Sequence, residues 1–234
     1  MLSGARARSS GSSQSEKFAW GGLLVVPLLI FVVLAVLVSD NAKPGPDARL
    51  LTFLNENVEG SALAGAAELL VGACLWLGLV ILPAIIGALS FRRRFTPALF
   101  LASVTVGSFL VERVLKHTVE RAAINHGQGY SFPSGSAMIS FAVIAAVVLL
   151  SGDRRRAWAC AAGAGLVFAY GLSIVSLGWH YPSDVVAGWC LAVALVVTLW
   201  LVLGRPTLGR APRESFPGVR PSTAAGLVDF TKIT

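Results

Sequence analysis

Long uncharged apolar runs alternate with short polar segments along the chain. Runs of about 20 residues predict membrane-spanning helices, because that length crosses a hydrocarbon core roughly 30 Å thick. Several runs are apolar on all sides rather than along one stripe, which argues against a soluble helical core. We therefore predict an all-α, polytopic membrane protein with six transmembrane helices. The expected spans are 18–39, a second within 61–90, about 96–116, about 133–151, 157–177 and 184–203.

The polar segments divide the rest of the chain. Residues 1–17 and 204–234 are rich in Ser, Gly, Pro and Arg, so we expect disordered tails around a membrane domain at 18–203. The loop at 40–60 contains an apolar pattern that predicts an amphipathic helix on the outer surface, which Asp47 can cap. This helix either covers a site or only links two spans.

Composition and charge support this class of protein. The chain is 55% hydrophobic and 13% charged, with a mean hydropathy of +0.74. Its tails and the two turns at 92–94 and 154–156 carry 14 of the Lys and Arg residues, whereas the opposite loops carry three. This distribution predicts that both termini are cytoplasmic. The net charge of +7 is then a topology signal rather than a sign of nucleic-acid binding.

Two short motifs hold the candidate chemistry. Residues 131–136 read Ser-Phe-Pro-Ser-Gly-Ser, a turn that can offer a hydroxyl and backbone N–H groups to an anion. Residues 178–184 read Gly-Trp-His-Tyr-Pro-Ser-Asp, which places His180 four residues before Asp184. That spacing suits a nucleophile or base oriented by an acid. The topology places both motifs outside the cytoplasm, so we predict phosphate chemistry at the outer face of the plasma membrane.

Two acidic residues within the expected spans need partners. Glu112 and Lys116 are four residues apart, so we expect them to pair on one helix face. Glu68 lies among small residues, and we expect it to face the interior of the bundle.

The motifs resemble those of the type 2 phosphatidic acid phosphatase superfamily, whose members are six-helix membrane enzymes. The family motifs are Lys-x6-Arg-Pro, Pro-Ser-Gly-His and Ser-Arg-x5-His-x3-Asp, and the resemblance covers roughly 18–203. It implies that His180 attacks phosphorus and that Asp184 orients it. It also implies that Lys116, Ser134 and Gly135 bind phosphate. No metal or cofactor is expected.

This sequence departs from the family pattern at three functional positions. Ala123 and Ile174 stand where the family has arginines, and Ser136 stands where it has a histidine that acts as the general acid. Losing a general acid costs about 10²–10⁴-fold in rate. Losing one electrostatic donor costs about 10²–10³-fold. Arg121 is a candidate to replace a guanidinium group, and His117 or His126 to replace the acid.

Three functional hypotheses follow. The first is a weakened or inactive member of the fold that binds a phosphorylated membrane lipid. The second is an active, divergent lipid phosphate or diphosphate phosphatase with His180 as the nucleophile. The third is an accessory subunit of a membrane assembly, suggested by small residues that permit close helix packing. These residues are Gly65, Gly72, Gly163 and Gly165.

Overall fold

The computed structural model describes residues 4–39, 45–124 and 129–206, and all the regular elements in these ranges are helical. The all-α prediction is thereby confirmed. The elements are α1 (Gly4–Ser39), α2 (Pro46–Val58), α3 (Ala62–Trp76), the π-helical turn η1 (Leu77–Ile81), α4 (Leu82–Phe91), α5 (Phe95–Val119), α6 (Gly135–Leu150), α7 (Asp153–Ser176) and α8 (Pro182–Val202).

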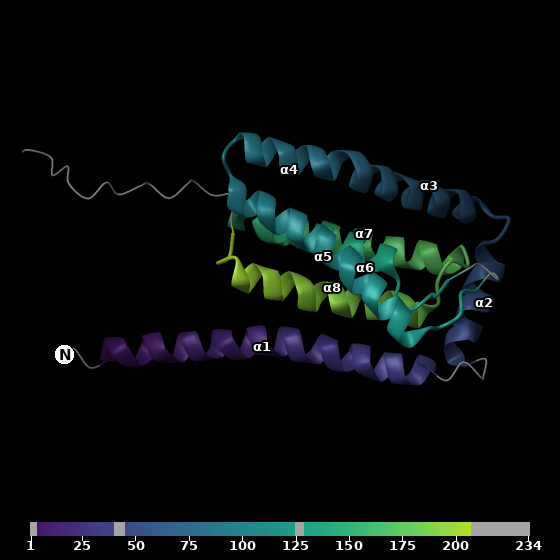
Figure 1. The fold of residues 1–234 in the computed structure, drawn as a ribbon, viewed down its shortest axis with the longest axis horizontal. Helices are drawn as coiled ribbons and strands as arrows, with labels where there is room; N and C mark the ends of the chain where they lie inside the picture. Colours follow the sequence, from purple (N-terminus) through teal and green to yellow (C-terminus); the bar gives the residue numbers. More distant parts are fainter. Residues whose placement is uncertain (1–3, 40–44, 125–128, 207–234) are drawn as a thin grey trace, which may run out of the picture.

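The long helices lie side by side, as Figure 1 shows. Helix α1 forms one flank, α3 and α4 form the other, and α5 to α8 lie between them. Helix α2 lies across one end of the bundle, close to the connections that lead into α6 and α8. The first turn of α1 and the last turn of α8 are both at the opposite end. The two candidate motifs therefore share the α2 end of the molecule.

Within the part of the chain that the structure describes, five helical segments are long and apolar enough to cross a membrane. They are Phe18–Ser39, Ala62–Phe91, Phe95–Val119, Arg155–Ser176 and Pro182–Val202. The remaining expected span is α6, whose 16 residues reach only about 24 Å at about 1.5 Å per residue. The backbone of α1 is helical from Gly4, although we expected a disordered tail as far as residue 17.

The second expected span is a single 30-residue segment that contains the π-helical turn η1. Pro83 follows this turn, near the start of α4. A proline ring cannot fit against the carbonyl of the preceding α-helical turn and has no N–H to donate, so a local widening of the helix relieves the conflict.

Small residues let α6 and α8 approach each other closely in the core. A Cβ atom added to Gly188 of α8 would lie 2.6 Å from the carbonyl oxygen of Ser134, so only glycine fits at that position. Alanines continue the contact on both helices, and Ala137, Ala142, Ala187 and Ala192 are fully buried. Helix α8 is thus held against the turn that begins α6, which fixes the two motifs relative to each other.

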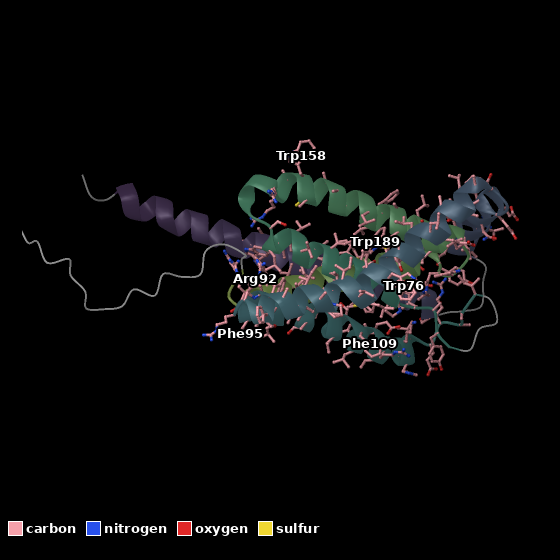
Figure 2. All side chains as sticks on the ribbon, turned by 90° about the horizontal axis from the view of Figure 1, so that it is seen from above. Trp76, Arg92, Phe95, Phe109, Trp158 and Trp189 are labelled. Atoms are coloured by element: carbon pink, nitrogen blue, oxygen red, sulfur yellow. The ribbon has the colours of Figure 1, made fainter. Side chains whose placement is uncertain are left out.

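The outward faces of the bundle are apolar, as expected for contact with lipid. Trp158 projects from α7 away from the bundle, and its side chain is 81% exposed (Figure 2). Large side chains on α3 are similarly exposed, including Leu69 and Trp76. Glu68 is also exposed, so the expectation that it faces the interior is wrong. It lies beside Leu69, on the outward side of α3, rather than on the side of buried Ala67 and Val71.

Candidate functional site

The junction between α7 and α8 positions His180 and Asp184. Gly178 has a φ of +71°, a left-handed conformation that lets the chain turn out of α7 without strain. Asp184 lies in the first turn of α8 and is fully buried, and its Oδ2 atom accepts a hydrogen bond from Tyr181 N at 3.1 Å. His180 Nδ1 is 3.7 Å from the same oxygen, too far for a hydrogen bond. That buried nitrogen has no hydrogen-bond partner among the described residues.

Arg121 enters this junction just beyond the end of α5. Its Nη1 atom donates to Asp184 Oδ1 at 2.6 Å and to Ser183 Oγ at 2.7 Å. Its guanidinium carbon lies 3.8 Å from the centre of the Tyr181 ring, within the range of a cation–π contact. Arg121 and His180 therefore face the two different oxygens of one buried carboxylate.

The turn at the start of α6 joins the same cluster through the backbone. Ser134 N donates to the carbonyl oxygen of Asp184 at 3.0 Å, so the two motifs are directly bonded. Ser134 also caps α6, because its hydroxyl accepts from Ala137 N at 3.4 Å. The hydroxyls of Ser134 and Ser136 are 3.4 Å apart. The first N–H groups of a helix have no carbonyl partner within the helix, so a helix start favours an anion.

Lys116 lies near this turn but is already paired. Its Nζ atom is 2.7 Å from Glu112 Oε1, which confirms the pair expected from their spacing. Glu112 is buried, and a Cβ atom added to Gly135 would lie 2.7 Å from its Cγ and Cδ. The carboxylate thus packs directly on the glycine of the α6 turn, and it brings the Lys116 ammonium group to that side of the site.

The family model of the PAP2 superfamily, the type 2 phosphatidic acid phosphatases, matches residues 97–207, which contain all of the site residues described above. Over this region the chain is similar to the PAP2 superfamily. The resemblance inferred from the motifs is confirmed.

Two further comparisons found a similar protein and a similar fold. The chain is 28% identical to phosphatidylglycerophosphatase B of Bacillus subtilis (strain 168) over 188 residues, which cover 71% of this chain and 88% of the relative. Its fold is similar to the crystal structure of a transmembrane PAP2-type phosphatidylglycerolphosphate phosphatase from Bacillus subtilis, with a TM-score of 0.69 and 23% identity. That match covers 81% of this chain and all of the other.

The three positions at which this chain departs from the PAP2 motifs carry no replacement charge of their own. Ile174 is fully buried and packs in an apolar cluster with Val175 and Val185. Ala123 has only a methyl side chain. Ser136 offers a hydroxyl, which holds its proton too tightly to act as an acid near neutral pH. Any compensation must therefore come from other residues of this chain.

Of the two candidates for compensation that the structure describes, Arg121 and His117, Arg121 is the one whose side chain reaches Asp184. His117 is exposed, and its ring packs edge-on against Tyr130 with the centroids 5.8 Å apart. His126 lies outside the described residues.

The Glu120 carboxylate raises the pKa of Tyr130, because a phenolate would be repelled by the neighbouring negative charge.

The role that the sequence predicts for Asp47 differs from the one that the structure shows. We expected Asp47 to cap its own helix, but the N-cap of α2 is Gly45. The Asp47 carboxylate instead caps α8, accepting from Ser183 N at 2.9 Å, and also binds Arg121 at 2.7 Å. The sequence signal, a Pro-Asp pair at a helix start, gave no indication of a partner 136 residues away.

Proposed function

We propose that this protein binds the phosphate group of a membrane lipid at the α2 end of the bundle, with hydrolysis weakened relative to a complete PAP2 site. The observation that carries the proposal is the Asp184 carboxylate, which holds Arg121 on one oxygen and faces His180 across 3.7 Å on the other. The nucleophile and a cation are thus retained, while the orienting hydrogen bond is not formed.

Binding is supported by the groups gathered around the α6 turn. The Ser134 hydroxyl and the first N–H groups of α6 are donors of the kind that hold phosphate oxygens. Lys116 and Arg121 add two cationic groups, each of which is paired with a carboxylate of the chain. Charge-assisted hydrogen bonds of this kind are about twice as strong as neutral ones. Retention of a phosphorylated headgroup therefore does not depend on the residues that are missing.

Weakened turnover is supported by the missing groups. A leaving oxygen must be protonated as its bond to phosphorus breaks, and Ser136 cannot supply that proton. Without the guanidinium groups absent at positions 123 and 174, charge on the transition state is less well stabilised. Each loss costs about two or more orders of magnitude alone, although such losses do not simply add.

An active, divergent phosphatase is the second candidate, and the position of Arg121 favours it. This side chain reaches the junction that holds His180, so one of the two missing guanidinium groups has a nearby substitute. The relative from Bacillus subtilis is named as a phosphatidylglycerophosphatase, which supports a lipid phosphate as the substrate class. A diphosphate would need less acid catalysis, because its leaving phosphate is already a stable anion.

The two candidates separate in one experiment on purified protein in nanodiscs. Phosphate release is measured from phosphatidic acid, phosphatidylglycerophosphate and a polyprenyl diphosphate, beside binding of the same lipids to the His180→Ala variant. Binding with release at least 100-fold below a complete PAP2 enzyme supports the first candidate. Fast release that His180→Ala abolishes, with a phosphohistidine trapped at His180, would establish the second. Absence of both binding and release would overturn both.

The membrane topology is part of the same proposal. We infer six crossings, of which the short helix α6 is the fourth, with both termini in the cytoplasm and the site outside it in the plasma membrane. The excess of Lys and Arg in the tails and in the turns at 92–94 and 154–156 supports this orientation. Labelling of single cysteines by an impermeant reagent in intact cells tests it. Thr52→Cys should react, whereas Arg93→Cys should react only after lysis.

The accessory-subunit hypothesis stays a prediction. An added Cβ would meet nothing within 4 Å at Gly65, Gly72 or Gly165, whereas Gly163 packs on Ile144. Purification in mild detergent tests it, because a partner at fixed stoichiometry would support it and a clean monomer would oppose it.

A further inference from the structure

Helix α2 is fastened across the α7–α8 junction by one face. Asp47, Leu51 and Asn55 recur every four residues and therefore lie on one side of the helix. Asp47 binds the first turn of α8, Leu51 is buried in the apolar cluster below, and Asn55 Nδ2 donates to Ser176 O at 2.9 Å. The amphipathic helix predicted from the sequence thus does more than link two spans.

The Asp47 carboxylate accepts hydrogen bonds from a set of donors that would also suit a phosphate group. Its Oδ1 atom accepts from Ser183 N at 2.9 Å. Its Oδ2 atom accepts from Ser183 Oγ at 2.6 Å and from Arg121 Nη2 at 2.7 Å. A backbone N–H at a helix start, a hydroxyl and a guanidinium group are also the donors that bind phosphate oxygens. A carboxylate of the chain itself therefore takes the contacts that a phosphorylated headgroup would use.

Arg121 would keep its position if Asp47 moved away. Its Nη1 atom remains bonded to Asp184 and Ser183, and its planar group remains stacked near the Tyr181 ring. Only the Nη2 side depends on Asp47. Asp47 is also 23% exposed, whereas Asp184 is fully buried, so Asp47 is the carboxylate that can leave at lower cost.

We propose that α2 is a latch in which Asp47 competes with the phosphate group of the ligand for Arg121 and Ser183. Entry of the headgroup displaces Asp47 and loosens α2, while Asp184 keeps Arg121 beside His180. This inference rests on the proposed phosphate-binding function, and it adds a built-in competitor that lowers the apparent affinity of the site.

Asp47→Asn tests the competition. The amide keeps the shape of the side chain and can still accept from Ser183 N, but it loses the charge that pairs with Arg121. Glu56→Gln is the matched control, since it removes the same charge from an exposed position of α2. Binding of inorganic phosphate is measured by calorimetry in detergent, and binding of phosphatidic acid is measured in nanodiscs.

Asp47→Asn should bind both probes about three- to tenfold more tightly than the wild type, the amount expected when one charge-assisted competitor is removed. Glu56→Gln should match the wild type. A gain for phosphatidic acid alone would show that the site needs the lipid as well as the phosphate. Equal or weaker binding by Asp47→Asn, with the wild type binding normally, would overturn the latch alone. No binding by any variant would overturn the proposed function and the latch together.

Hydrogen–deuterium exchange of the wild type gives a readout that does not depend on a variant. Addition of phosphatidic acid should make the amides of residues 47–58 exchange faster, because the headgroup replaces Asp47. If Asp47 instead only positions Arg121 for the ligand, these amides should become slower to exchange. Slower exchange would therefore overturn the latch even where the ligand binds tightly.

Discussion

The two cationic side chains of the site differ in how far along the chain their carboxylate partners lie. Lys116 is paired with Glu112, one turn earlier on the same helix. Arg121 is paired with Asp47 and Asp184, which are 74 and 63 residues away along the chain. The position of Lys116 is therefore set within α5, whereas that of Arg121 depends on how α2 and α8 pack. The contrast indicates that Lys116 is the cation less sensitive to disruption of tertiary packing.

Removal of the buried Asp184 carboxylate should have the largest effect on stability, because it takes away one of the two carboxylates that hold Arg121. Asp184→Asn leaves the 12%-exposed Arg121 side chain with only Asp47 as a counter-charge. Breaking a buried ion pair from one side costs about 3–5 kcal/mol, and we expect the lower end of that range because Asp47 remains. Thermal unfolding in detergent measures the loss. Glu112→Gln should cost much less, and equal losses in the two variants would contradict the comparison.

The second-largest loss of stability is expected from a change that pushes α8 away from the turn at the start of α6. In Gly188→Ala the new methyl group would meet the Ser134 carbonyl oxygen at 2.6 Å, and backbone cannot move aside as a flexible side chain can. We expect a loss of about 1–3 kcal/mol in unfolding free energy, as is typical of an overpacked core. Gly165→Ala is the control, because its added Cβ meets nothing within 4 Å. It should be neutral or slightly stabilising, since alanine favours a helix more than glycine does.

The same comparison explains how much of the molecule could be predicted from sequence. The spans follow from apolar runs, and the Glu112–Lys116 pair follows from helical periodicity, so both are local properties. Asp47 could not be assigned to Arg121 because a contact over 74 residues depends on where α2 packs. The exposed position of Glu68 was missed for a related reason, because the composition of α3 does not reveal which side contacts α7.

Removal of the charge of Glu112, the partner of Lys116 on the same helix, should destabilise the protein less than Asp184→Asn or Gly188→Ala does. Glu112→Gln removes the counter-charge of Lys116, whose side chain is 23% exposed, and we expect a loss of about 0.5–1 kcal/mol in unfolding free energy. The freed ammonium group should also bind inorganic phosphate more tightly, which calorimetry can measure. Arg113→Gln is the control, because Arg113 is mostly exposed and lies 3.6 Å from Glu112. A larger loss in Arg113→Gln would contradict the local pairing of Lys116.

The smallest expected effect concerns Glu120, which lies between Lys116 and Arg121 in sequence but acts on Tyr130. Glu120→Gln should lower the pKa of Tyr130 towards the usual value for tyrosine, because the phenolate would no longer face a carboxylate. Absorbance titration of the phenolate measures the change, and Tyr130→Phe identifies which part of the signal belongs to Tyr130. Added salt should reduce the difference between the wild type and Glu120→Gln, since charges at an exposed site are screened. If the pKa of Tyr130 does not change in Glu120→Gln, the repulsion is not its cause.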